Sequence, residues 1–139
     1  MKGSDLQVMV ADYLRLQYPD VLFHSDFGSG IKLTMGQAAK QKRQNGGRRA
    51  WPDMFIAKPK LYPDAYDLNR ASKLSRWGLF LELKKEGTRL KKKNGEWATP
   101  HIAEQAKVLD NLRLNGYAAE FAIGFDEAKK WIDFYLGSK

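Results

Sequence analysis

Segments with helical patterns and segments with strand patterns alternate along this chain, and that alternation restricts its fold more than any other feature. The helical segments are marked by their starts: Ser4 and Thr34 each precede a glutamine by three residues, the spacing of a capping box, and Thr99 precedes a proline. We expect helices over residues 4–18, 34–45, 99–115 and 126–136, and strands over residues 21–24, 53–57, 78–84 and 118–125. This order favours an α/β fold, a sandwich with a mixed central β-sheet flanked by helices.

Length and composition indicate one domain over residues 1–139. The 139 residues are 43% hydrophobic and 12% aromatic, which is too apolar for a disordered chain. The absence of cysteine excludes disulfide scaffolds, thiolate zinc sites and cysteine nucleophiles, and His24 and His101 are too far apart for a helical metal pair. No segment approaches the roughly 18 apolar residues of a membrane span, and the N-terminus lacks a signal-peptide pattern, so we expect a soluble cytoplasmic protein.

Positive charge is concentrated in the middle of the chain. The net charge is +8, and residues 31–93 carry 17 Lys and Arg against 5 Asp and Glu. The two basic clusters are Lys40, Lys42, Arg43, Arg48 and Arg49, followed by Lys84, Lys85, Arg89, Lys91, Lys92 and Lys93. All of the second cluster except Lys84 lies on residues 85–98, where Asn94 and Gly95 predict the turn of a hairpin or loop.

A basic stripe of this kind fits a nucleic acid, because each neutralised phosphate releases counterions. A solvated surface that merely aids solubility is an equally simple interpretation. An acidic membrane fits less well, because neither cluster lies in an amphipathic helix with a large apolar face.

The segment over residues 78–84 carries two charged groups at the end of an apolar strand. Side chains two residues apart share a face of a strand, so Glu82 and Lys84 project together while the alternate leucines point inward, as in a half-buried strand. Alone, this pair is most simply an ordinary ion pair. Asp53, at the start of the preceding apolar strand, changes the interpretation, because two carboxylates can then converge on a hard cation such as Mg²⁺. That arrangement suits phosphodiester hydrolysis.

Three blocks of the sequence resemble the VRR-NUC branch of the PD-(D/E)XK nuclease superfamily. They are residues 46–56 (GGRRAWPDMFI), residues 78–84 (GLFLELK), and Gln105 followed by Leu109, Leu112 and Gly116-Tyr117. The blocks occur in the order of the family and extend from about residue 36 to the C-terminus. The resemblance implies a restriction-endonuclease-like sandwich with a Mg²⁺- or Mn²⁺-dependent nuclease site.

Carried onto this sequence, the family pattern implies a role for each site residue. Asp53 and Glu82 become the metal ligands, the carbonyl of Leu83 completes the metal shell, and Lys84 is the catalytic lysine. Gln105 lines the site and helps hold the water or a ligand, although an ordinary polar helix residue is as good an interpretation.

The first helix departs from the family pattern, which usually supplies a glutamate there. This chain offers Asp5, which we include in the catalytic set, but a first-turn acid is also favoured by the helix dipole alone. Trp51 has two interpretations as well, a platform for a nucleobase or a core residue beside a strand.

These features together predict a Mg²⁺- or Mn²⁺-dependent endonuclease that cuts DNA, with branched DNA as its substrate in the manner of a Holliday-junction resolvase. A four-way junction is two-fold symmetric, so a homodimer with two active sites is expected. The alternatives are a nicking, flap or replication-associated nuclease with the same site, and a non-catalytic nucleic-acid-binding domain of the same fold. No membrane partner is expected.

Overall fold

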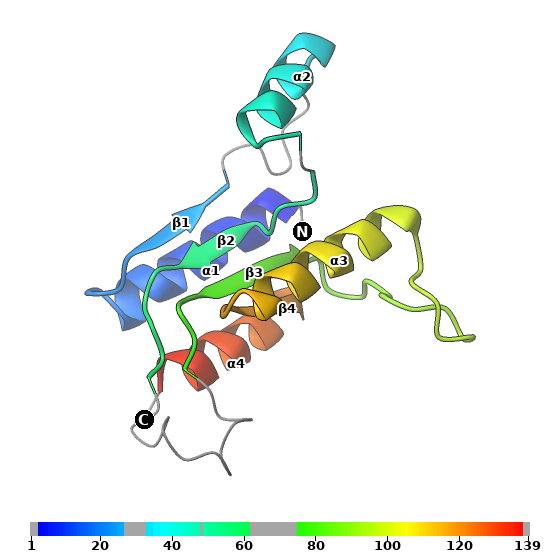
Figure 1. The fold of residues 1–139 in the computed structure, drawn as a ribbon. Helices are drawn as coiled ribbons and strands as arrows, with labels where there is room; N and C mark the ends of the chain where they lie inside the picture. Colours follow the sequence, from blue (N-terminus) through cyan, green and yellow to red (C-terminus); the bar gives the residue numbers. More distant parts are fainter. Residues whose placement is uncertain (1–2, 27–32, 48, 62–74, 138–139) are drawn as a thin grey trace.

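The computed structural model describes residues 3–26, 33–47, 49–61 and 75–137. In these ranges helices and strands follow one another in the order that the sequence predicts (Figure 1). They are α1 (Gly3–Gln17), β1 (Phe23–Ser25), α2 (Met35–Gln44), β2 (Met54–Ile56), β3 (Leu79–Lys84), α3 (Pro100–Leu114), β4 (Ala118–Ile123) and α4 (Gly124–Leu136).

The strands form one mixed sheet in the order β1-β2-β3-β4. Strands β1, β2 and β3 pair antiparallel, while β4 runs parallel to β3. A parallel pair requires a crossover connection, and α3 lies in that connection. The predicted class, an α/β sandwich with a mixed central sheet flanked by helices, is therefore confirmed.

Helices cover both faces of the sheet. Helices α1 and α4 pack on one face and α3 on the other (Figure 1). The larger core cluster joins α1, α4 and inward-facing strand residues such as Leu79 and Leu81, and a smaller cluster joins α3 to Phe80 and Ala119. Strand β3 is half-buried as predicted, but Glu82 on its second face is buried beneath α3, while Phe80 and Lys84 on that face stay partly exposed.

The predicted helix starts are correct at α2 and α3 and shifted elsewhere. Thr34 forms the full capping box with Gln37, and the Thr99 side chain accepts a hydrogen bond from the Ile102 amide. Helix α4 begins at Gly124, two residues before the expected position, because β4 ends at Ile123. Helix α1 begins one residue before Ser4, whose side chain lies outside the described part of the chain.

Two basic segments extend from the body of the molecule. Helix α2 stands away from the sheet, and no residue of this helix is buried (Figure 1). Residues 85–98, which we call the arm, form the predicted hairpin with an antiparallel bridge between Lys91 and Trp97. Trp97 anchors the arm: its ring lies 5.8 Å from that of Phe121 on β4, and Lys91 Nζ lies 4.7 Å from the Trp97 ring centre.

Some sequence-based expectations lie outside the described residues. One of these is the role of Arg48 in DNA binding. None of the helices that the structure describes has the length and apolar character needed to cross a membrane.

Candidate active site

The pairing of β2 with β3 brings Asp53 and Glu82 together. Met54 pairs with Leu81 and Phe55 with Phe80, so the same register extended by one residue places Asp53 opposite Glu82. Asp53 Oδ2 accepts a hydrogen bond from the Leu83 amide at 2.8 Å, which fixes its carboxylate against β3. The two carboxylates therefore meet although 28 residues separate them in the sequence.

Glu82 is held in an unusual environment for a carboxylate. Only 5% of the residue is exposed, and Oε1 accepts a hydrogen bond from Gln105 Nε2 at 2.6 Å. Lys84 Nζ lies 4.0 Å from the same oxygen. Within the described part of the chain, Glu82 Oε2 and Gln105 Oε1 are buried without a hydrogen-bond partner. Buried polar atoms without partners are rare in proteins and often mark the place of an ion or water.

Burial and the neighbouring Asp53 charge raise the pKa of Glu82 to about 9, against the opposing influence of Lys84. Two negative charges would repel one another in this shielded site, so without a cation the folded protein keeps a proton on Glu82. A cation placed between the two carboxylates would offset the free-energy cost of ionising both, since bound cations reverse the local preference for a protonated acid.

The donor set fits a hard divalent cation. Mg²⁺ accepts one or two carboxylates and keeps several waters, and Asp53, Glu82 and the backbone of Leu83 line one cavity. Among the residues that the structure describes, no group of three or more His, Cys, Asp and Glu side chains is placed to hold a metal ion. The oxygen donors that this part of the cavity offers are thus two carboxylates and a main-chain carbonyl, and their role as metal ligands stays a prediction.

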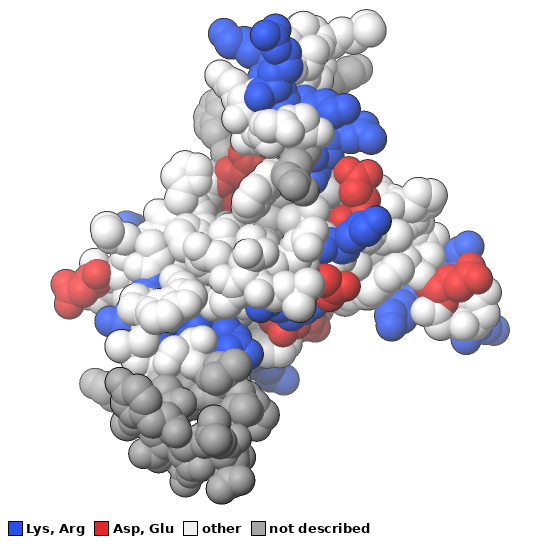
Figure 2. All heavy atoms as spheres, viewed as in Figure 1, with Lys and Arg blue, Asp and Glu red and all other residues white. Residues whose placement is uncertain are grey.

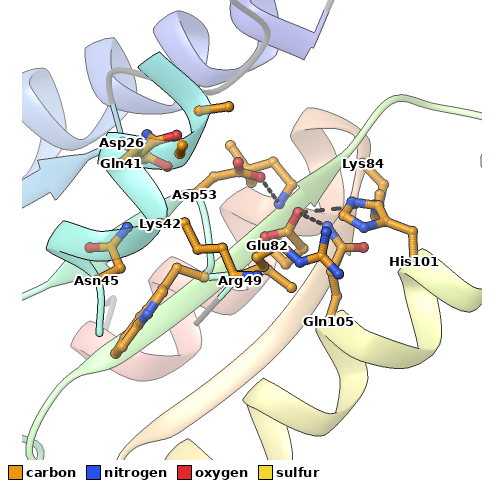
Figure 3. Close-up of a pocket in the computed structure, with 15 residues that line it drawn as sticks. Asp26, Gln41, Lys42, Asn45, Arg49, Asp53, Glu82, Lys84, His101 and Gln105 are labelled. Carbon is orange, nitrogen blue, oxygen red and sulfur yellow. Dashed lines mark hydrogen bonds and ion pairs between the residues drawn. The ribbon is translucent and has the colours of Figure 1, made fainter. Parts of the chain in front are cut away.

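The cavity has a volume of about 610 Å³ and lies between the sheet, α2 and α3. Figure 3 shows Asp53, Glu82, Lys84 and Gln105 close together at one side of it, with Lys42 of α2 across the opening. Arg49 also lines the cavity, and its Nε lies 3.7 Å from Glu104 Oε1. The cavity is therefore lined by carboxylates and by two basic side chains, one of which is paired with Glu104.

Most of the predicted site residues meet in this cavity. Asp53, Glu82, Leu83, Lys84 and Gln105 all line it, as do Lys42 and Arg49 of the predicted DNA-binding set. The other described members of that set are exposed on α2 and on the arm, namely Lys40, Arg43, Lys85, Arg89, Lys91, Lys92 and Lys93.

Asp5 is placed differently. It is an exposed residue in the first turn of α1 and is not among the residues that line the cavity. Its catalytic role stays a prediction.

Asp26 was missed by the sequence-based reasoning. It lines the cavity, its amide donates to Asp53 O at 2.7 Å, and its own carbonyl accepts from Gln7 Nε2 at 3.0 Å. Gln7 is the buried polar residue that α1 contributes here, and it also contacts Ser25. The available signal was the position of Asp26 directly after β1, at the end of the sheet where Asp53 directly precedes β2.

His101 is a second cavity residue that the sequence did not point to. It lies in the first turn of α3, one turn before Gln105. Its position was predictable from helical spacing, because residues four apart share a face of a helix.

The comparisons with known proteins concern the fold. No protein-family model matches this chain, and no curated protein matches its sequence. A solved structure described as a VRR_NUC domain protein is similar to it, with a TM-score of 0.60 and 22% identity over 99% of this chain and 89% of that one. This likeness confirms the predicted restriction-endonuclease-like fold, and the chain shares the fold of a VRR_NUC domain protein over almost its whole length.

Proposed function

We propose that this protein is a Mg²⁺- or Mn²⁺-dependent endonuclease that hydrolyses phosphodiester bonds in DNA. The observation that carries the proposal is the meeting of Asp53 and Glu82 beside Lys84 in a cavity that Lys42 and Arg49 also line. The fold shared with a VRR_NUC domain protein supports it. The concentration of positive charge between residues 31 and 93 also supports the proposal.

Asp53, Glu82 and the Leu83 carbonyl would hold the metal ion. When bound, Mg²⁺ or Mn²⁺ supplies charge stabilisation at the phosphoryl group and activates a water molecule. Gln105 donates to Glu82 Oε1 and so orients that carboxylate, while its buried Oε1 can accept a hydrogen bond from water. Lys84, 4.0 Å from the same carboxylate, is placed to orient the attacking water and to offset negative charge in the transition state.

The DNA-binding surface in this proposal runs from α2 across the cavity to the arm. Figure 2 shows Lys and Arg side chains over α2 and on the arm, with acidic side chains on the surface between them. Lys42 and Arg49 inside the cavity continue the stripe toward the carboxylates. Such a surface contacts phosphates and holds the strand to be cut over the site.

Branched DNA is the substrate that we favour. Helix α2 and the arm extend from the body as separate basic segments, so each can contact a different duplex arm of a branch (Figure 1). Symmetric cleavage of a four-way junction requires two active sites related by a two-fold axis, so the proposal includes a homodimer.

The catalytic assignment is tested with Asp53→Asn and Glu82→Gln. We expect either change to lower Mg²⁺-dependent cleavage at least about 100-fold, because each removes a charged metal ligand, and to leave salt-sensitive DNA binding largely intact. Cleavage is measured on four-way junction, flap, nicked and linear duplex DNA with Mg²⁺, Mn²⁺ or a chelator. Asp12→Asn, the same chemical change at an exposed position of α1, is the matched control.

Cleavage by Asp53→Asn at the wild-type rate would show that the site assignment is wrong. Binding without cleavage of any substrate, in the wild type and in both variants, would favour the non-catalytic alternative. The preferred substrate in the panel distinguishes a junction nuclease from a nicking or flap nuclease.

The DNA-binding assignment is tested by replacing Lys91, Lys92 and Lys93 with alanine. We expect weaker binding on all sequences and a smaller dependence of the affinity on salt, by about one unit of slope for each lost phosphate contact. The control is Lys129→Ala with Lys130→Ala, which removes exposed charges from α4. An unchanged affinity and salt slope in the arm variant would place the DNA elsewhere.

A further inference from the structure

A second cavity lies next to the candidate active site and takes no part in the mechanism described above. Its volume is about 380 Å³, which is within the range of small-ligand pockets. Its lining consists of Trp51, Val108, Asn111, Leu112, Asn115 and Tyr117. Trp51 lines both this cavity and the catalytic one, so the two spaces adjoin at that side chain.

Aromatic side chains support this cavity from the sheet. The Trp51 ring lies 6.0 Å from that of Phe80, and the Tyr117 ring lies 5.3 Å from the same phenyl group in an edge-to-face arrangement. Phe55 in turn stacks on Phe80 at 4.4 Å. Trp51 is nevertheless 41% exposed, so a large aromatic surface is held in place by its neighbours and remains accessible.

The backbone before Trp51 is strained. Ala50 has a φ of 65°, the one positive φ at a non-glycine residue in the part of the chain that the structure describes. Such a conformation costs on the order of 1 kcal/mol or more and persists where the surrounding structure requires it, often at a binding site. Here it sets the direction in which the chain presents Trp51.

Helix α3 provides the polar side of the second cavity. Val108, Asn111 and Asn115 follow one another at intervals of three and four residues, so they share one face of the helix. Gln105, six residues before Asn111, lies in the catalytic cavity, and six residues of α-helix rise about 9 Å. Helix α3 therefore lines both cavities, which adjoin at Trp51, so one DNA strand can reach both of them.

We infer that the second cavity binds an unpaired nucleobase of the DNA strand that the active site cuts. Trp51 supplies a ring on which a base can stack, and the Asn111 amide supplies a donor and an acceptor for the edge of the base. The inference rests on the proposed nuclease function and deepens it. Because an unpaired base requires no disruption of pairing, the cavity favours DNA with unpaired nucleotides close to the cut over a fully paired duplex.

The test uses DNA strands that carry 2-aminopurine, whose fluorescence falls on stacking, at an unpaired position or in a fully paired duplex. Binding is measured in the presence of a chelator, so the readout does not depend on cleavage. With the wild type we expect quenching at the unpaired position and tighter binding of that DNA. Trp51→Ala and Asn111→Leu should each weaken binding to the unpaired substrate about tenfold and leave binding to the paired duplex unchanged.

A control variant and a test of folding make the result specific. Trp77→Ala removes another exposed tryptophan, one that does not line either cavity, and should leave both affinities unchanged. Asn111→Leu acts on a residue that lies outside the catalytic cavity, and a circular dichroism melt verifies that each variant is folded.

An equal loss of affinity for paired and unpaired DNA, or no quenching at the unpaired position with the wild type, would overturn the inference. Asp53→Asn separates this failure from a failure of the proposed function, since that variant should still quench 2-aminopurine while it no longer cuts. Normal cleavage by Asp53→Asn together with quenching would refute the nuclease site and leave the base-binding cavity standing. Absence of any DNA binding would overturn both proposals.

Discussion

Replacing Glu82 with glutamine should stabilise the metal-free protein at neutral and alkaline pH. Glu82 is 5% exposed, and its Oε2 is buried without a hydrogen-bond partner in the described part of the chain. Burial and the charge of Asp53 raise its pKa from 4.5 to about 9. The folded state therefore keeps a proton on Glu82 that the unfolded state gives up.

The sign and size of the effect follow from that difference. A pKa that is higher in the folded state contributes stability in full below about pH 4.5 and loses it as the pH rises toward about 9. Each pH unit in this window changes the folding equilibrium about tenfold, so the wild type should lose on the order of 3 kcal/mol between about pH 6 and about pH 8. Glutamine has no charge to desolvate, so the unfolding free energy of the variant should not fall in this way as the pH rises.

The assay is urea unfolding with a chelator at both pH values, followed by circular dichroism. The difference in unfolding free energy between Glu82→Gln and the wild type should grow in favour of the variant as the pH rises. Added Mg²⁺ should stabilise the wild type more than the variant, because it binds the folded carboxylates. Glu96→Gln, the same change on the exposed arm, is the control. A difference between Glu82→Gln and the wild type that does not vary with pH would refute the reasoning.

Two further predictions concern the stability of the fold, and both are measured by chemical denaturation. A Cβ at Gly78 would lie 2.5 Å from Cε1 of Phe55. Gly78→Ala should therefore destabilise the fold by about 2 kcal/mol through overpacking. A loss of stability below about 0.5 kcal/mol would mean that the phenyl ring moves away freely. The Tyr18 hydroxyl donates to Asp133 Oδ1 at 2.7 Å, so Tyr18→Phe should cost about 1–2 kcal/mol. An unchanged stability there would show that water replaces the hydroxyl without loss.

The sequence alone was enough to predict the order of the elements and several of the side chains that line the cavity. Capping side chains such as Thr34 and Thr99 act on amides three residues away, so their effect on the helix start is local. The alternation of β3 likewise places Glu82 and Lys84 on one face whatever lies around them. The concentration of Lys and Arg along the chain is a property of the sequence itself, so the basic clusters could be identified without the structure.

The tertiary structure decided which of these side chains come together. Asp53 reaches Glu82 only through the register of β2 on β3, and Asp26 joins the cavity only because β1 pairs beside them. The burial that raises the pKa of Glu82 comes from α3, which also closes the cavity beside Trp51. The pairing of strands and the burial of side chains under a helix depend on contacts between segments that are tens of residues apart in the sequence. Local sequence patterns, which depend on neighbours within a few residues, do not contain that information.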